Sequence, residues 1–484
     1  MSDPDLTPHP KVRRLRMPLL VVALALAVVA GIGVFLVNRD PAGRRDGGDD
    51  NSPDRHGRPI EVSENGRYLM DRNGRPWMMA ADTAWSIFSK LNAAEVSTYL
   101  DSRKSTGFNT VAISVVDPTS GGVQSTVNQT RDHLFNNNNI AYPNDQFFAT
   151  VDDVVAQAEG RGMTVIIFPL WLRFAHEDPT FTTQNVERYG QFLGQRYRDD
   201  DNIIWAMGGD FGGQTEGLCP DQAEVRALAE SIKAADPRHL MTYHPGTDLS
   251  TSTCYNEDDW VDFNSTYWDF NFHNMASAYR NVLRDYNSTP RRPALMLESG
   301  YEGPHPGDDD PNALTARTSR IQSYYMILAG GLGFTYGANS TYYTDNTSPA
   351  AIRSWQQTLD IPGAAQQGYV AKLFQSHSWW ALAPDQDHRA VVSGYGTFGE
   401  QDYVTTGRAD NGGLVISYLP TERTITVDMG ALSGPVTAQW YDPTSGVYLT
   451  IATGQPNTGL SNFAPPGKNS VGDDDWVLIL DANA

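Results

Sequence analysis

Short runs of apolar residues alternate with longer amphipathic stretches from about residue 77 to about residue 375. A short apolar run between turn residues indicates a buried strand, whereas apolar positions spaced three and four residues apart indicate a helix. The predicted strands cover residues 77–81, 110–115, 164–168, 203–210, 240–243, 261–264, 293–298 and 333–336. The predicted helices cover residues 93–106, 151–160, 183–197, 222–234, 274–284, 313–329 and 362–375.

Strands that alternate with helices in this way predict an α/β fold, and eight of them predict a (β/α)8 barrel of the TIM type. An open, doubly wound sheet is the alternative, but no G-x-G-x-x-G motif follows an early strand. We therefore expect residues 59–382 to form a (β/α)8 domain of the kind that places its chemistry at the carboxyl ends of the strands.

After about residue 383 the helical periodicity stops, and short alternating runs lie between Gly, Pro and Asn turns. This spacing predicts a small antiparallel β-sandwich over residues 383–484. Its predicted strands cover residues 390–392, 403–406, 414–418, 424–427, 436–441 and 476–480. Such a domain either binds glycan or packs against the barrel, and we favour packing.

An uncharged apolar segment occupies residues 17–37 and predicts a transmembrane helix of roughly 30 Å. The basic residues before it predict a cytoplasmic tail over residues 1–16, with the rest of the chain outside the cell. These basic residues are Lys11, Arg13, Arg14 and Arg16. Residues 38–58, rich in Gly, Pro, Asp and Arg, predict a flexible linker. We expect a single-pass protein of the cell membrane; the alternative is a cleaved signal segment and a secreted protein.

The formal net charge of −21 over 484 residues restricts the possible partners. A chain this acidic lacks the electrostatic footprint of a nucleic-acid-binding protein. A neutral oligosaccharide or polysaccharide suits it better than a polyanion. Apart from this substrate and the membrane, the sequence gives no sign of an obligate protein partner, and it predicts no cofactor.

Two cysteines, Cys219 and Cys254, fall in presumed loops. Outside the cell such a pair predicts a disulfide, and two unpaired buried thiols are the alternative. Two cysteines alone make a poor zinc site. The acidic runs Asp308–Asp310 and Asp473–Asp475 could hold calcium, but such runs are usually solvated surface, so we predict no metal.

Two carboxylates, Asp210 and Glu298, each end a predicted buried strand. Glycoside hydrolysis needs a proton donor for the leaving oxygen and a nucleophile or activated water for the sugar carbon. We expect Asp210 to act as acid/base and Glu298 as nucleophile, with retention of configuration favoured. The alternative is that either acid caps a helix or pairs with Arg291 or Arg292.

Further polar and aromatic residues near strand ends predict a sugar-binding pocket. Asp82 ends the first strand and could bind sugar hydroxyls, with Trp85 as a stacking surface; a helix cap and a core tryptophan are the alternatives. The other candidates for substrate binding are Asn109, Trp171, His244, Asn264, Tyr267, Glu302, Tyr336 and Asn339.

Several motifs in order along the chain resemble a known family. These are GRYLMDRNGRPWMMAADTAWSIF, STGFNTV, IIWAMGGD, LMLESGYEG and AGGLGFTYGANS. Together they resemble the apiosidase-like glycoside hydrolases (family 140, domain of unknown function 4038). The resemblance implies a (β/α)8 barrel, exo-acting glycosidase activity and catalytic acids at Asp210 and Glu298. The tail, with AQWYDPTSGVY, resembles the β-sandwich labelled a “putative collagen-binding domain”.

Three hypotheses of function remain. The first is a surface-anchored, exo-acting glycoside hydrolase that acts on an extracellular plant or bacterial polysaccharide. The second is a non-catalytic carbohydrate-binding or adhesion protein on a barrel scaffold. The third, a polysaccharide lyase or epimerase, needs basic residues to neutralise a uronic acid, and Arg173, His176 and His244 could serve. The presence of both carboxylates favours the first.

Overall fold

The computed structural model describes residues 60–213, 217–267, 275–303, 314–339, 341, 344 and 354–482. The predicted cytoplasmic tail, transmembrane segment and linker, residues 1–58, lie outside these ranges. Within them, no helix is both long and apolar enough to cross a membrane.

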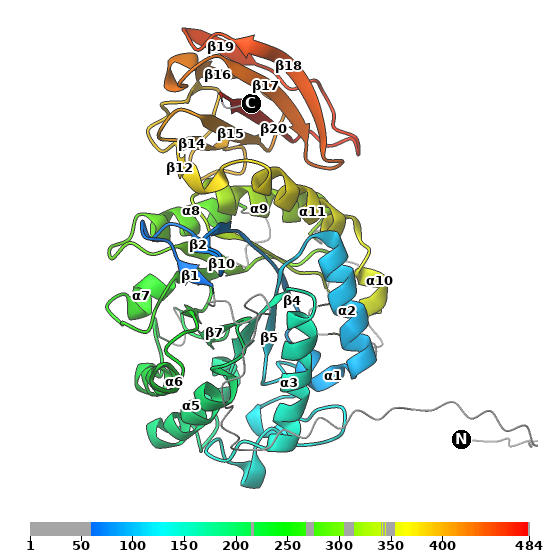
Figure 1. Cartoon of the computed structure of the whole chain (residues 1–484), viewed down its shortest axis with the longest axis vertical. Coiled ribbons are helices and arrows are strands. Elements are labelled where there is room, and N and C mark those ends of the chain that lie inside the picture. The colour runs from blue at the N-terminus through cyan, green and yellow to red at the C-terminus, as the bar shows by residue number, and fades with distance from the viewer. Residues whose placement is uncertain are drawn as a thin grey trace, which may run out of the picture. The chain divides into compact units, whose positions relative to one another are not determined.

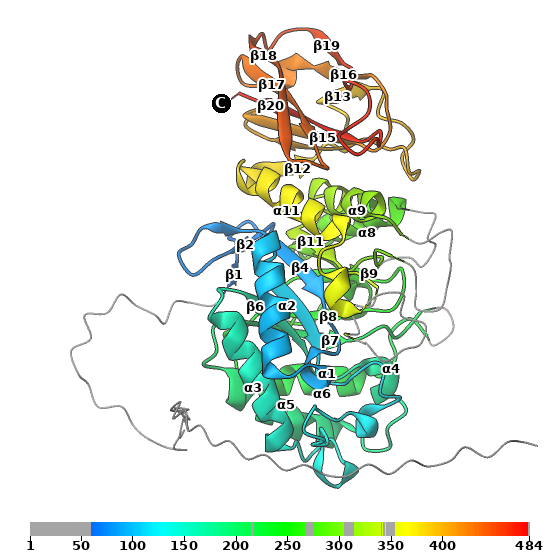
Figure 2. The ribbon, with the colours of Figure 1, turned by 90° about the vertical axis from the view of Figure 1, so that its right-hand side faces the viewer.

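Parallel strands form the centre of the first domain (Figures 1 and 2). They are β4 (Met79–Thr83), β5 (Thr110–Ser114), β6 (Thr164–Phe168), β7 (Ile203–Gly208), β8 (Met241–His244), β9 (Asn264–Tyr267), β10 (Ala294–Glu298) and β11 (Gly333–Tyr336). Every residue of these strands is buried, which explains the nearly continuous apolar runs of most of them.

Hydrogen bonding divides these strands between two sheets. Six follow the order β11-β4-β5-β6-β7-β8, and β9 pairs with β10 in a separate sheet. Single backbone bonds join the two: the Asp262 N–H donates to the Met241 carbonyl at 2.9 Å, and the Leu332 N–H donates to the Ala294 carbonyl at 2.8 Å. The domain is therefore an α/β half-barrel of six continuous parallel strands, completed by a two-stranded sheet.

Helices connect these strands and cover the sheet. They are α1 (Ile87–Lys90), α2 (Ala93–Thr106), α3 (Asp145–Glu159), α4 (Leu172–Ala175), α5 (Thr183–Tyr197), α6 (Gln222–Ala235), α7 (Thr251–Tyr255), α8 (Ala276–Tyr286), α9 (Ala316–Leu328), α10 (Trp355–Thr358) and α11 (Pro362–Gln375). Helix α2 shows why the boundaries could be predicted: Asn92 and Glu95 form a capping box, and Gly107 ends the helix at φ 105°.

Strand β9 covers Asn264–Tyr267, so it begins three residues later than the strand predicted over residues 261–264. The prediction followed the apolar residues Val261 and Phe263, whereas the strand itself is polar. Its hydroxyl groups are satisfied inside the fold: Ser265 Oγ donates to the Tyr243 carbonyl at 2.5 Å, and Thr266 Oγ1 donates to the Leu249 carbonyl at 2.7 Å. A strand of this kind is stabilised by side-chain hydrogen bonds that hydropathy does not reveal.

An antiparallel β-sandwich follows. Its strands are β12 (Leu382–Pro384), β13 (Val391–Ser393), β14 (Thr405–Ala409), β15 (Leu414–Leu419), β16 (Ile425–Asp428), β17 (Val436–Asp442), β18 (Val447–Gln455), β19 (Leu460–Phe463) and β20 (Trp476–Asp481). One sheet has the order β12-β14-β15-β20-β17-β18, and the other has the order β13-β16-β19. A three-stranded sheet of β1 (Glu61–Val62), β2 (Leu69–Met70) and β3 (Pro76–Trp77) precedes the first domain.

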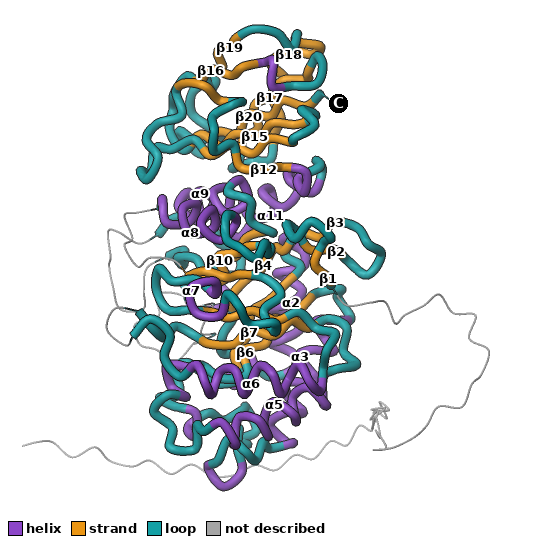
Figure 3. The backbone as a smooth tube through the Cα atoms, turned by 90° about the vertical axis from the view of Figure 1, so that its left-hand side faces the viewer, coloured by secondary structure: helices purple, strands orange, loops and turns teal. Residues whose placement is uncertain are grey.

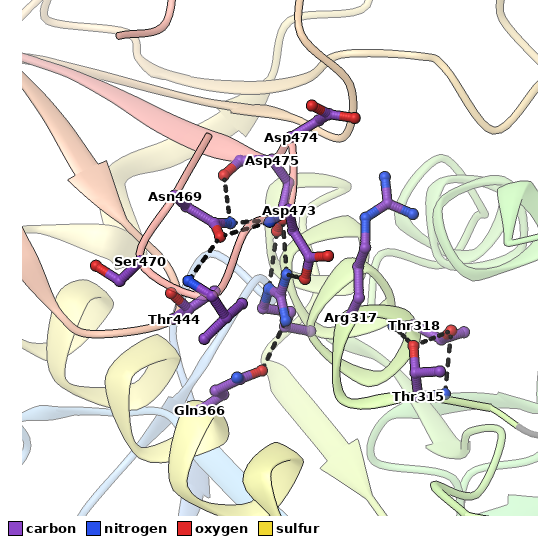
Figure 4. A network of polar contacts seen from close by, with 12 residues as sticks. Thr315, Arg317, Thr318, Gln366, Thr444, Asn469, Ser470, Asp473, Asp474 and Asp475 are labelled. Carbon is purple, nitrogen blue, oxygen red and sulfur yellow. Dashed lines mark hydrogen bonds and ion pairs between the residues drawn. The ribbon is translucent and has the colours of Figure 1, made fainter. Parts of the chain in front are cut away.

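Helices α8, α9 and α11 lie between the parallel strands and the sandwich (Figures 1 and 3). A buried guanidinium joins the two parts: Arg320 of α9 donates to Asp475 at 2.7 and 2.8 Å, to Asp473 at 2.6 Å and to Gln366 at 2.7 Å. Figure 4 labels Gln366, Asp473 and Asp475 in this network. The sandwich thus packs against the first domain, the arrangement that we favoured from the sequence. Asp473 and Asp475 anchor Arg320, which differs from the solvated surface that we expected, whereas Asp474 is partly exposed. Asp308–Asp310 lie outside the described residues.

Arg320→Met is expected to destabilise this junction by about 3–5 kcal/mol, because it leaves the buried Asp475 without its cation. Urea unfolding of the variant measures the change. Lys468→Met is the matched control, since Lys468 pairs with Asp474, the partly exposed middle residue of the same acidic run, and its replacement should have little effect. Equal midpoints for the two variants would contradict a structural role for the buried pair.

Candidate active site

A sharp turn at the end of β7 presents the first predicted catalytic residue. Gly208 and Gly209 have φ of 89° and 124°, and Asp210 has φ of 44°. A Cβ on Gly208 would lie 2.2 Å from the His244 carbonyl oxygen, and one on Gly209 would lie 2.8 Å from the Trp171 ring. Only glycine fits both positions, so the turn brings the Asp210 backbone past its neighbours and into the site.

The second predicted catalytic residue, Glu298, ends β10 and has both carboxylate oxygens bound. His244 Nε2 lies 2.8 Å from Oε2, and the Tyr301 hydroxyl donates to Oε1. The Trp85 indole N–H in turn donates to the Tyr301 oxygen at 2.8 Å. Glu298 is 4% exposed, and its carboxylate is held by two side chains, His244 of β8 and Tyr301 of the segment after β10.

His244, fully buried at the end of β8, contacts the Glu298 carboxylate and the backbone of Asp210. A proton on Nε2 makes the ring a donor to Glu298. Nδ1 faces both the Asp210 backbone N–H at 3.4 Å and the Pro245 carbonyl at 2.9 Å. Without a proton Nδ1 accepts from the Asp210 N–H, and with a proton it donates to the Pro245 carbonyl.

The pKa of Asp210 is raised to about 6, chiefly because the side chain is buried. The charge of Glu298 raises this pKa further, whereas His244 and Arg173 lower it. Arg173 Nη1 donates to Asp210 Oδ2 at 3.3 Å from a half-exposed side chain. The two carboxyl groups therefore interact electrostatically, and the raised pKa suits Asp210 to carry a proton near neutral pH.

Aromatic rings line the space around the acids. The Trp85 ring lies 4.9 Å from Trp171 and 5.0 Å from Phe168, and the His244 ring lies 4.9 Å from Tyr267. The structure thus brings together six of the residues singled out from the sequence: Trp85, Trp171, Asp210, His244, Tyr267 and Glu298. Tyr301 and Phe168 were missed, although Tyr301 follows Glu298 by three positions at a strand end.

Three predicted binding residues belong to the structural interior. Asp82 is fully buried and accepts hydrogen bonds from Tyr99 and Arg103. Burial raises the pKa of Asp82 even though Arg103 opposes the shift. Asn109 precedes β5 and binds the Ala80 N–H and Met78 carbonyl, and Asn264 begins β9 and donates to Ser288 Oγ at 3.0 Å. Both asparagines lie at strand starts, the end opposite to Glu298.

The remaining predicted binding residues, Glu302, Tyr336 and Asn339, lie beside the candidate site and connect structural elements. Tyr336 donates to Glu302 at 2.7 Å, and the Gly363 N–H donates to the same carboxylate at 3.1 Å. The Asn339 amide donates to the Gly303 carbonyl. These bonds tie β11 and the start of α11 to the segment after β10. Glu302, Tyr336 and Asn339 therefore hold the segments around the site in position, whereas the sequence predicted that they contact the sugar.

The Cys219–Cys254 disulfide is present, with the Cα atoms 5.6 Å apart. It joins the segment after β7 to α7 and braces the loop that carries Asp221. His176 binds that aspartate at 2.6 Å and packs on the Phe211 ring. Arg173, His176 and His244 thus each bind a carboxylate of this chain, which argues against the lyase or epimerase that would need them for a uronic acid.

Asp210→Asn is expected to stabilise the fold above pH 6 by up to about 3 kcal/mol, since two pKa units between the folded and unfolded states amount to about that energy. Because the pKa of Asp210 is raised in the folded protein, the parent has its full free energy of unfolding below about pH 4, the pKa of the unfolded state. The parent loses this stability as the pH rises through about 6. Unfolding of both proteins from pH 4 to pH 8 tests this. Asp101→Asn should do the opposite, because Arg161 lowers the pKa of Asp101.

Among the described residues, no group of three or more His, Cys, Asp or Glu side chains is arranged to hold a metal ion. A profile of the family “Apiosidase-like, catalytic domain” matches residues 63–381, and a profile described as “Putative collagen-binding domain of a collagenase” matches residues 384–481.

Two solved structures resemble most of the chain. A structure titled “Glycoside hydrolase” is 28% identical, with a TM-score of 0.76 over 88% of this chain and 97% of the other. A glycoside hydrolase family 5 protein from Bacteroides vulgatus ATCC 8482 is 26% identical, with a TM-score of 0.77 over 87% of this chain and 93% of the other. No curated protein matches the sequence.

Proposed function

The chain belongs to the apiosidase-like family of glycoside hydrolases, and from this membership we propose an exo-acting hydrolase with Asp210 as acid/base and Glu298 as nucleophile. The eight parallel strands then act as one (β/α)8 barrel whose carboxyl ends hold both acids. One observation carries the assignment: the pKa of Asp210 is raised to about 6 beside a Glu298 that two donors hold in place.

In the proposed first step, a Glu298 oxygen attacks the anomeric carbon while Asp210 donates its proton to the leaving oxygen. In the second step, Asp210 takes a proton from water, whose oxygen attacks the same carbon and releases Glu298. The donors His244 and Tyr301 orient the nucleophile. Two displacements retain the anomeric configuration.

The substrate that fits best is the neutral terminal sugar of an extracellular plant or bacterial polysaccharide. The net charge of −21 disfavours a polyanion, and the largely buried rings of Trp85, Trp171 and Tyr267 form an apolar wall behind the two acids. The exo mode rests on family membership. A membrane-anchored location rests on the apolar segment 17–37, which leaves the hydrolase facing the extracellular side.

The test is a glycan screen with residues 54–484, which form one compact unit. Plant pectins, arabinans and bacterial envelope polysaccharides are incubated with the protein, and released monosaccharides are identified. NMR of the anomer that forms first reports retention or inversion. Release of internal fragments would overturn the exo mode, and a first-formed anomer of opposite configuration would overturn Glu298 as nucleophile.

A further inference from the structure

A pocket of about 200 Å³ lies away from the candidate active site, where the end of α11 meets the six-stranded sheet of the β-sandwich. Water occupies roughly 30 Å³ in the liquid, so this volume admits a small ligand. Gln375, Ser376, His377, Ser378 and Trp380 line one side, and Leu414 and Asp481 line the other. None of these residues is among those that surround Asp210 and Glu298.

Two neighbouring tryptophans mark the wall of this pocket. Trp379 is 6% exposed and packs on Tyr68, whereas Trp380 is 38% exposed. The turn Trp379–Ala381 sets the two rings at 88° to each other, which holds one ring in the core and the other at the pocket. An indole kept at the surface beside a hollow is suited to stack on an apolar ligand face.

Polar groups surround the exposed indole. His377 Nδ1 donates to the Leu373 carbonyl at 2.8 Å, so Nε2 of the neutral ring is left as an acceptor. Ser376 Oγ lies 3.4 Å from the hydroxyl of Tyr448, a residue of β18 that is itself 36% exposed. The exposed side chains of Gln375 and Ser378 make no hydrogen bond within the described part of the chain.

The chemistry of this pocket matches a neutral sugar. A pyranose or furanose ring offers C–H groups to an indole face and hydroxyls to amide, hydroxyl and imidazole groups. Among the described residues, no Lys or Arg lines the pocket, and Asp481 adds negative charge, so an anionic ligand is disfavoured. We propose that this pocket, with Trp380 as its stacking surface, is a second carbohydrate-binding site that holds a neutral sugar of a polysaccharide away from the catalytic pair.

This inference rests on the proposed function for its ligand class. A site outside the catalytic centre raises the local concentration of polymer ends, because one bound chain presents its other sugars at a high effective concentration. It contributes nothing to cleavage of an oligosaccharide too short to reach both sites. Polymer binding and short-substrate hydrolysis should therefore respond separately to changes in the pocket.

The experiment is affinity electrophoresis of the full chain in gels that contain neutral arabinan, galactan, xylan or mannan. Trp380→Ala should weaken retardation about tenfold, the loss of one stacking contact. Ser378→Arg fills the pocket without removing a packed side chain, and it should also weaken retardation. Phe398→Ala is the matched control, since Phe398 is an exposed aromatic ring of the sandwich outside the pocket. Hydrolysis of a short oligosaccharide should be unchanged in all three.

Unaltered retardation of both pocket variants would overturn the second site, as would absence of retardation of the parent in every gel. Either result leaves the proposed function standing if hydrolysis persists. Retardation that depends on Trp380 in a protein that hydrolyses nothing would support the second site and overturn the proposed function.

Discussion

Glu298→Ala is expected to lower kcat by about 10⁴-fold or more, because removal of a catalytic nucleophile abolishes the covalent step. Added azide should then restore turnover of a substrate with a good leaving group. Azide occupies the space of the missing carboxylate, attacks the anomeric carbon and displaces the leaving group, so the product is a glycosyl azide of inverted configuration. His244 and Tyr301, the donors that hold Glu298, remain to orient the anion.

Glu302→Gln is the matched control for this prediction. Glu302 is also buried and lies four positions further along, but its oxygens bind Tyr336 and the Gly363 N–H. Its replacement should affect stability, with kcat kept within about tenfold of the parent. A Glu298→Ala protein that keeps its activity, or that gains none from added azide, would remove Glu298 from the role of nucleophile.

The contrast between Asp82 and Glu298 shows how far the sequence could predict the site. Each is a carboxylate at the end of a buried apolar strand, so both fit the expectation for a catalytic acid. Tyr99 and Arg103, 17 and 21 residues after Asp82, decide its role by neutralising it inside the fold. Such partners depend on which helix face meets which strand, and no local pattern specifies that contact.

Strand order and helix boundaries were more predictable because their causes are local. Apolar runs mark β6, β7, β10 and β11, and capping residues mark both ends of α2 and the start of α5. Helix α3 begins at Asp145, six residues before its predicted start. The exceptions are elements whose stability comes from elsewhere. The polar β9 depends on side-chain bonds to β8, and β18 is largely exposed and depends on backbone pairing with β17. Hydropathy misses both kinds.

The rate of hydrolysis is expected to fall about tenfold per pH unit above pH 6, since cleavage needs Asp210 protonated and its pKa is about 6. Asp210→Asn should remove this alkaline limb and lower kcat/KM by about 10²–10⁴-fold for a sugar leaving group. The loss should be much smaller for a dinitrophenyl leaving group, which departs without a proton. Parallel pH profiles with the two substrates test both points.

Arg173 provides the control for the identity of the titrating group. Its guanidinium lowers the pKa of Asp210 from a half-exposed position, so Arg173→Gln should raise that pKa. The alkaline limb then moves to higher pH by a fraction of a unit, and added salt should reduce the difference from the parent, because exposed charges are screened. The fall in rate above pH 6 would belong to another titrating group if it stayed at the same pH in Arg173→Gln and persisted in Asp210→Asn. Asp210 would then not be the catalytic acid.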